Sequence, residues 1–254
     1  HCLKKARSRG LSVDQARRGY LELEKLLLAA KRDQRPADGY FVSFWRLLSQ
    51  YPEILGWEKL WTDSYHEIRS ETYRIAKSIA PSKPVGFHIL HQATLSPFYR
   101  AEEDYAETAN YADYVKPAMY NIAGGERMAA FLDRISQTVF HDAKPEEFMP
   151  FYEKIMNYDE APYAKLSESG LSAEYVARET RRVVEAVRGR IAVYPGIDVG
   201  VPCHGKQVTP GDVRDAVKSA FTAGAQGVVL SRKYSEMKLA NLAGAAEGLR
   251  EAGV

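Results

Sequence analysis

The chain has 254 residues, which is enough for one large domain with a substantial core. Its composition is typical of a globular protein, and a formal net charge of +2 gives no reason to expect a nucleic-acid or membrane partner. No run of about 18 apolar residues is present, so the sequence predicts no membrane span. Cys2 and Cys203 lie far apart and complete no zinc or redox motif, and we expect no cofactor.

The chain begins His1-Cys2-Leu3-Lys4, with neither a methionine nor a signal peptide. We expect it to be the interior of a longer protein. That expectation leaves the compartment open, with a secreted or periplasmic location among the alternatives.

The first fifty residues predict helices and no strand. Ser12 and Gln15 fit a capping box, and apolar positions at helical spacing predict a helix over 13–32. A second helix is predicted over 40–50. Residues 53–58 predict the first strand, followed by a helix that Thr62 or Asp63 caps and that runs to about 79.

The next segment predicts two strands whose faces can be told apart. In the strand 85–90, Val85, Phe87 and Ile89 share one parity and would face helices, whereas His88 belongs to the other parity and would face a barrel interior. A helix over about 98–111 leads to a strand over 114–120, where Pro117 is awkward for a central strand. A helix over 126–138 follows Gly124-Gly125. Residues 139–171 read as an insertion or loop region of a kind that often binds ligands.

The last third predicts two more strand–helix units. Ser172 caps a helix to Val187, a strand follows over 191–198, and Thr209-Pro210 begins the next helix. The last strand covers 227–231, and the last helix ends near 251. Five strands, each followed by a helix, indicate an α/β fold with a parallel sheet. We expect one TIM-type (β/α) barrel domain over 1–254 that holds the C-terminal five βα units of an eight-fold barrel; an open doubly wound sheet is the alternative.

Polar residues end four of the predicted strands: Glu58, His88, Tyr120 and Asp198. Active sites of (β/α) barrels gather at the carboxyl ends of the strands, so we expect these side chains to share a pocket. Two carboxylates in one pocket point to sugar chemistry.

Glu58 stands beside Trp57 and close to Trp61, and indole rings that exclude water raise a carboxyl pKa and suit it to protonate a leaving group. Asp198 would be the base or nucleophile. The structural alternatives are an ion-paired Glu58 at the barrel rim and an Asp198 that binds backbone amides in a turn.

The remaining strand-end residues are candidates for substrate binding. Imidazole, phenol and amide groups can bind sugar hydroxyls, and aromatic rings offer flat faces on which a sugar ring can stack. Each also has a structural alternative, such as a core histidine or an acidic residue at a helix start. The candidates are Trp57, Trp61, His88, His91, Tyr120, Asn121, Arg232, Tyr234 and Glu236.

Three short motifs carry a family resemblance: Trp57-Glu58, Gly86-Phe87-His88, and the run 224–232, Gly-Ala-Gln-Gly-Val-Val-Leu-Ser-Arg. With these motifs the chain, over roughly 53–254, resembles bacterial glycoside hydrolases with (β/α)8 barrels, in the style of the large retaining clan. The resemblance implies that Glu58 matches the acid/base at strand 4 and Asp198 the nucleophile at strand 7. Trp57 replaces the usual Asn and Asp198 the usual Glu, and the shorter Asp fits an inverting mechanism or a different nucleophile.

The sequence therefore predicts a hydrolase of glycosidic bonds with a carbohydrate substrate, Glu58 as general acid and Asp198 as base or nucleophile. One alternative is a metal-dependent sugar isomerase or hydrolase, in which Glu58, His88, Asp198 and Glu236 would hold a divalent ion. Another is a barrel that binds carbohydrate without catalysis.

Overall fold

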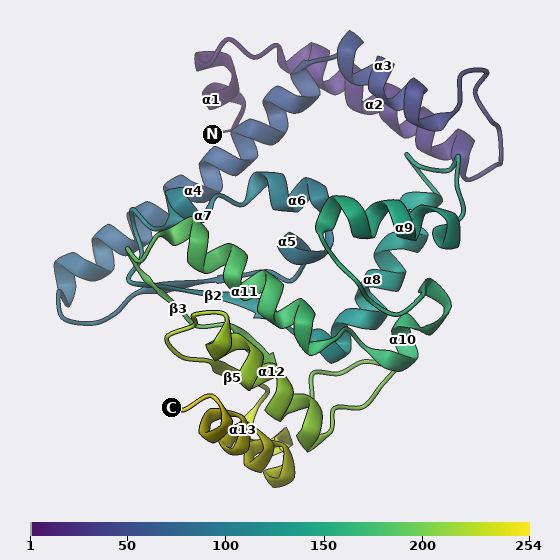
Figure 1. Ribbon diagram of the computed structural model, residues 1–254. Coiled ribbons are helices and arrows are strands. Elements are labelled where there is room, and N and C mark those ends of the chain that lie inside the picture. Colours follow the sequence, from purple (N-terminus) through teal and green to yellow (C-terminus); the bar gives the residue numbers. More distant parts are fainter. Residues whose placement is uncertain (1) are drawn as a thin grey trace. The chain divides into compact units, whose positions relative to one another are not determined.

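The strands of the computed structural model, which describes residues 2–254, form a parallel sheet in an otherwise mainly helical chain (Figure 1). The strand order is β1-β2-β4-β5, and β3 pairs with the first half of β2. Every pairing is parallel, and helices connect the strands along the chain, as the sequence predicts. The strands are β1 (Gly86–Ile89), β2 (Tyr114–Met119), β3 (Ala192–Val193), β4 (Gly196–Asp198) and β5 (Val229–Ser231).

β3 and β4 are two pieces of one strand beside β2. Both pair with β2 at the same sequence offset, so the register is continuous across the break. Pro195 lies in the break, opposite Pro117 of β2. Val115 pairs on the side of β3, and the Pro195 carbonyl accepts from the Val229 N–H on the side of β5, so it is Pro117 that has no N–H to donate across the break. The strand predicted over 191–198 therefore exists, with an interruption opposite the proline of β2.

The two faces of the sheet differ at β1 and in the first half of β2, whereas further along the residues of both faces are buried, among them Ala118, Gly196 and Asp198. Val115, Val193 and Ile197 are fully buried and lie on the face against which helices pack. His88 and Lys116 lie opposite each other on the other face, where His88 is exposed and Lys116 half-buried. Ile89 is buried and His88 exposed, as alternation along this strand predicts, while a barrel interior on the side of His88 stays a prediction.

The chain divides into two compact units, one comprising the chain up to Glu67 together with Phe131–Met149, the other comprising Ile68–Ala130 and Pro150–Val254. In the first unit the buried residues Leu47, Leu48 and Ile54 form a core. Ser12 caps its longest complete helix by accepting a hydrogen bond from the Gln15 backbone N–H, as predicted. Its helices are α1 (Cys2–Ser8), α2 (Val13–Ala30), α3 (Tyr40–Gln50), the beginning of α4 (Glu53–Ile79), and parts of α8 (Asn121–Ser136) and α9 (Pro145–Met156).

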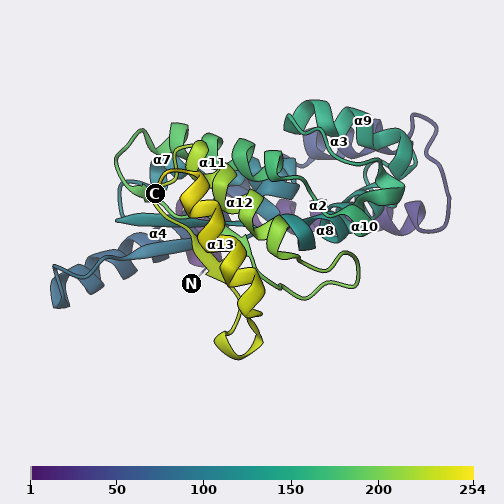
Figure 2. The same cartoon turned by 60° about the horizontal axis from the view of Figure 1, so that its bottom comes forward.

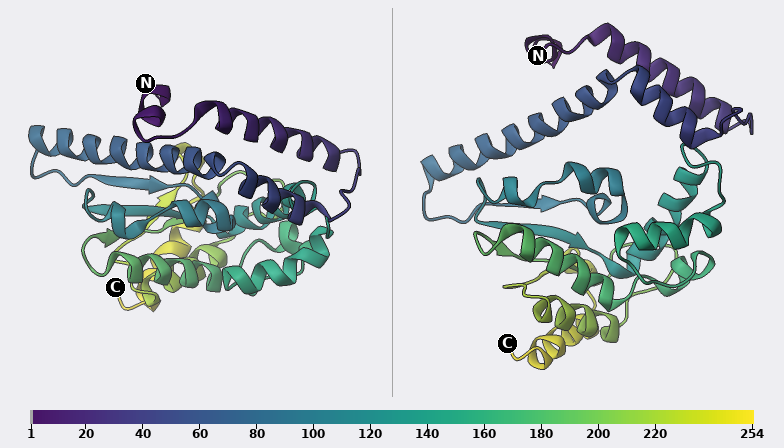
Figure 3. Two further views of the ribbon diagram at one scale, coloured as in Figure 1. Left: turned by 90° about the horizontal axis from the view of Figure 1, so that it is seen from above. Right: turned by 45° about the horizontal axis from the view of Figure 1, so that its top comes forward.

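The second unit holds the sheet. In both views of Figure 3, α11 lies along one face of the strands, and α12 and α13 pack along each other in Figure 2. Ser172 caps α11, and a capping box of Thr209 and Asp212 begins α12, at the positions that the sequence predicts. The remaining elements are α5 (Gln92–Leu95), α6 (Pro97–Glu102), α7 (Tyr105–Thr108), the short helix η1 (Tyr163–Lys165), α10 (Leu166–Ser169), α11 (Ala173–Val187), α12 (Pro210–Thr222), η2 (Tyr234–Glu236) and α13 (Leu239–Glu251).

The strand predicted over 53–58 is wrong. These residues begin α4, which runs without a break from Glu53 to Ile79. Ile54 and Leu60 are buried, and Gly56 allows Leu11 to approach, because a Cβ there would lie 2.7 Å from Leu11 Cδ1. A glycine inside a helix costs only about 1 kcal/mol, which such packing can offset.

The described residues therefore form a mixed α/β fold with a parallel sheet, while the single barrel domain stays a prediction. The predicted insertion over 139–171 contains α9, η1 and α10. In residues 2–254, no helix is both long enough and apolar enough to span a membrane.

The close approach of α12 and α13 gives a stability test. A Cβ on Gly244 of α13 would lie 2.1 Å from the Pro210 carbonyl oxygen, so Gly244→Ala must push the two helices apart. We expect it to lower the free energy of unfolding by about 1–3 kcal/mol in urea denaturation. The matched control is Gly211→Ala in α12, where the nearest atom is 3.8 Å from the Cβ; equal stabilities of the two variants would contradict this packing.

Candidate functional site

A lysine and a tyrosine form a hydrogen-bonded pair at the carboxyl end of β2. Lys116 Nζ donates to Tyr120 Oη at 2.6 Å and lies 4.9 Å from the centroid of its ring. Lys116 also crosses Gly196 of β4, where a Cβ would come within 2.5 Å of Lys116 Cε. The missing side chain at Gly196 thus makes room for the lysine on the sheet face. Tyr120 shares this half-buried environment, at the strand end where the sequence predicts a site residue.

His88 is the cross-strand neighbour of Lys116. Partial burial and then the charge of Lys116 lower the pKa of His88 below 6.5, so the imidazole is mainly neutral at pH 7. His88 is exposed, and its strand neighbour Lys116 links it to the Lys116–Tyr120 pair.

His91 is buried in a hydrogen-bond chain that fixes its tautomer. Arg127 Nη1 can only donate, so His91 Nδ1 accepts from it at 3.0 Å and Nε2 carries the proton. Nε2 donates to Tyr175 Oη at 2.9 Å, and Tyr175 donates to Thr94 Oγ1 at 2.6 Å, since the Thr94 hydroxyl donates to the His91 carbonyl. His91 is therefore a core residue that holds Arg127, which lies 5.6 Å from the Tyr120 ring centroid.

Burial, then the charge of Arg127, lowers the pKa of His91 from 6.5 to about 3. The cap of α11 contributes to this arrangement. Ser172 Oγ accepts from the Tyr175 N–H in the first turn, and so places the Tyr175 side chain in the core. The cap residue Ser172 and Arg127 are thus linked through Tyr175 and His91.

Asp198 ends β4 as predicted, but backbone amides occupy its carboxylate. Oδ1 accepts from the N–H groups of Gly200 and Val201 at 3.0 and 2.7 Å, and Oδ2 accepts from the Ala123 N–H at 3.0 Å. Ala123 lies in the first turn of α8, whose N–H groups have no partner within the helix. The carboxylate, 1% exposed, thus joins the end of β4 to the start of α8, which is the structural alternative considered for it.

Glu58 and its two tryptophans lie in α4 and not at a strand end, which corrects the prediction. Glu58 belongs to the first unit, where the Tyr20 hydroxyl donates to its carboxylate. Trp57 is half-buried, and Trp61 is 63% exposed and stacks on Tyr65 in the same helix. Asp198 belongs to the second unit, so neither unit by itself contains the predicted pair of carboxylates.

The other predicted residues fall into two groups. Asn121 is buried at the start of α8 and donates to the Leu171 carbonyl at 3.4 Å. After β5, Arg232 forms an ion pair with Glu236, and Tyr234 is 95% exposed. Within residues 2–254, no three His, Cys, Asp or Glu side chains are grouped so that they could hold a metal ion, so the predicted metal quartet does not assemble there.

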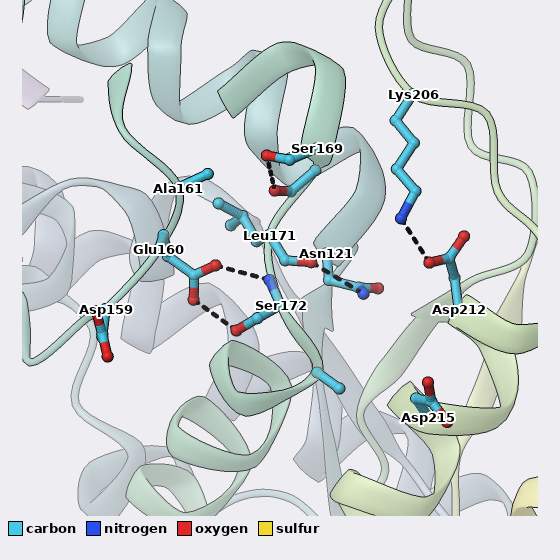
Figure 4. Close-up of a pocket in the computed structure, with 12 residues that line it drawn as sticks. Asn121, Asp159, Glu160, Ala161, Ser169, Leu171, Ser172, Lys206, Asp212 and Asp215 are labelled. Atoms are coloured by element: carbon cyan, nitrogen blue, oxygen red, sulfur yellow. Dashed lines mark hydrogen bonds and ion pairs between the residues drawn. The ribbon is translucent and has the colours of Figure 1, made fainter. Parts of the chain in front are cut away.

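A polar pocket of about 280 Å³ opens beside Asn121 (Figure 4). The Glu160 carboxylate accepts from both the N–H and the hydroxyl of Ser172, and burial raises the Glu160 pKa. Lys206 forms an ion pair with Asp212 at 2.6 Å. These polar groups mainly form hydrogen bonds and ion pairs with one another. The pocket therefore lies at a junction of loops, at the starts of α11 and α12, that internal polar contacts hold together.

Two important residues were not among the sequence candidates. Lys116 stands in the strand Tyr-Val-Lys-Pro-Ala-Met, and its polar character between the buried Val115 and Pro117 was the signal that could have found it. Arg127 lies inside α8, and no sequence signal distinguishes it from other helical arginines. Comparison with known protein families, with curated proteins and with solved structures found no match.

Asp198→Asn separates a structural role of the carboxylate from a catalytic one. An asparagine offers one oxygen where two are used and points an NH₂ group at a backbone N–H. We expect the free energy of unfolding to fall by about 2 kcal/mol or more in urea denaturation. Unchanged stability together with lost activity would contradict the structural role and restore the predicted catalytic one.

The low pKa of His91 makes stability depend on pH. Because the folded-state pKa is about 3, below the ordinary 6.5, the unfolded chain takes up this proton first as the pH falls below about 6.5. We expect this histidine to remove up to about 1.4 kcal/mol of stability per pH unit between pH 6.5 and 5. Urea unfolding of the wild type and His91→Gln over that range measures it, and identical pH slopes would contradict the assignment.

Proposed function

We propose that this chain belongs to a carbohydrate-active enzyme of the glycoside hydrolase type, whose sugar lies on the sheet face formed by His88, Lys116 and Tyr120. The observation that carries the proposal is the Lys116–Tyr120 pair on the partly exposed face of a parallel sheet whose other face is buried. The carboxyl ends of such strands are where (β/α) barrel enzymes bind their substrates, and the barrel itself is part of the proposal.

The site chemistry suits a hydroxylated ligand. Lys116 offers further N–H donors, and the neutral His88 ring offers an acceptor. The rings of Tyr114 and Tyr194 contact each other beside them at a tilt of 39°, with centroids 5.3 Å apart, and both side chains are half-buried. Amine, imidazole and phenol groups next to aromatic rings match the alternating polar edges and apolar faces of a sugar.

Tyr120 is the proton donor in this proposal. Because Lys116 donates to Tyr120 Oη, the hydroxyl proton of Tyr120 is left for another acceptor, and among the described residues none takes it. That proton would go to the leaving-group oxygen as the glycosidic bond breaks, and the proton that the attacking water loses as it adds to the sugar carbon would restore the Tyr120 hydroxyl. This replaces the role that the sequence predicts for Glu58, which lies in α4.

Tyr120→Phe tests the proton donor. We expect hydrolysis of an alkyl glycoside to fall about 100-fold or more, since the alkoxide must be protonated as it leaves. Hydrolysis of the 4-nitrophenyl glycoside of the same sugar should fall much less, because 4-nitrophenolate leaves without a proton. The kcat of each substrate is measured for both proteins, with Tyr99→Phe on the exposed surface as the matched control. Equal losses on both substrates, or none, would contradict the assignment.

A carbohydrate-binding protein without turnover is the second candidate. One observation favours it: Asp198, the carboxylate that ends β4, already accepts three backbone N–H groups. Glycoside hydrolases generally use two carboxyl groups, although in some of them a tyrosine replaces one. Sugar binding that Tyr120→Phe weakens, with no hydrolysis of either glycoside by the wild type, would favour this candidate.

A further inference from the structure

We propose that the ligand of this face carries an oxyanion, a carboxylate or a phosphate, which lies between Lys116 and Arg127. The inference rests on the proposed function in assigning a sugar to the face. It goes further by naming the substrate class, an acidic sugar, and by adding Arg127 to the binding residues.

The first observation is that two cations that contact the Tyr120 ring have no counterion. Lys116 Nζ and Arg127 Cζ lie 4.9 and 5.6 Å from the centroid of the same Tyr120 ring. Among residues 2–254, neither cation has a carboxylate within the 4.0 Å of an ion pair, and Asp198 is occupied by backbone amides. Partly buried positive charges without a partner favour an anion from outside the chain.

Three other partly buried arginines of the same unit have carboxylate partners. Arg100 and Arg182 bind the two carboxylate oxygens of Glu179, and Arg69 binds Glu103 at 2.9 Å. Arg178 of α11 is half-buried and, like Arg127, forms no ion pair. What distinguishes Lys116 and Arg127 is that two such cations contact one aromatic ring.

Both cations are held in place before a ligand arrives. His91 Nδ1 accepts only from Arg127 Nη1, so the other N–H donors of the guanidinium are free to bind an anion in a forked arrangement. Tyr120 and the gap over Gly196 fix Lys116 on the sheet face. A preorganised pair loses little conformational entropy when it binds.

The pKa of His88 responds to the positive charge of Lys116. It faces Lys116 across the strands, and the charges of Lys116 and Arg69 both lower its pKa after the effect of burial. Two charged groups affect the pKa of His88: its strand neighbour Lys116 and Arg69 of α4. The charge of Arg69 is neutralised by Glu103. An anion beside Lys116 would offset the remaining positive field, so its binding should raise the pKa of His88.

Four probes separate the anion from the sugar: glucose, glucuronate, glucose 6-phosphate and inorganic phosphate. Their dissociation constants are measured by NMR titration of the full chain at 20 and 300 mM NaCl. We expect glucuronate or glucose 6-phosphate to bind at least ten-fold more tightly than glucose, with the preference falling at high salt. Which of the two binds better distinguishes a carboxylate from a phosphate ligand.

Variants assign the effect to the two cations. Lys116→Gln and Arg127→Gln should each weaken binding of the acidic probe about ten-fold. Arg127→Lys keeps the charge and loses the fork, so it should have an intermediate effect even if the Gln variant unfolds. Lys154→Gln, an exposed lysine of α9, is the matched control and should change nothing. The His88 pKa, followed by NMR, should rise when the acidic probe is bound.

The failures can be told apart. Glucose that binds as tightly as its acidic derivatives would overturn the anion and leave the sugar site standing. Inorganic phosphate that binds as tightly as glucose 6-phosphate, with no glucose binding, would support the anion and contradict the sugar. Binding that survives loss of both cations, or no binding of any probe, would overturn the inference.

Discussion

The arrangement of this molecule depends on the alternation of side chains along β2. Val115 and Met119 are fully buried on one face, and a strand that buries one face cannot slip by a residue without exposing its whole apolar set. Lys116 and Tyr120 must then lie on the other side of the strand. The burial of one face thereby fixes the chemistry of the other, and Gly196 of β4 leaves the space that the lysine occupies.

The position of Arg127 depends on a second feature, the hydrogen-bond chain through His91. It begins at an ordinary helix cap, Ser172, and passes through Tyr175 and His91 to Arg127. Every donor and acceptor in that chain has one consistent role, which rigidifies the cluster. Burial holds His91 in its neutral form, with a pKa of about 3, which makes the fold less stable at low pH. The same histidine holds the Arg127 guanidinium beside Tyr120.

Much of the fold followed from local signals. The caps at Ser12, Ser172 and Thr209 begin helices as predicted, and alternation along 85–90 separates the exposed His88 from the buried Ile89. The failure at 53–58 has a physical reason: a short apolar run is ambiguous between strand and helix, and burial of Ile54 in a helical core decided it. The sequence predicted less of the site than of the fold. Arg127 is positioned by a hydrogen bond to His91, which lies 36 positions away in the chain, and no local pattern indicates such a contact.

The position of glucuronate in a crystal structure of its complex with this protein tests the central claim most directly. The account predicts that the carboxylate lies within hydrogen-bond distance of Lys116 and Arg127, with the sugar ring over the face that carries His88 and Tyr120. A sugar bound instead in the pocket beside Glu160 and Asp212, with Lys116 and Arg127 untouched, would contradict it.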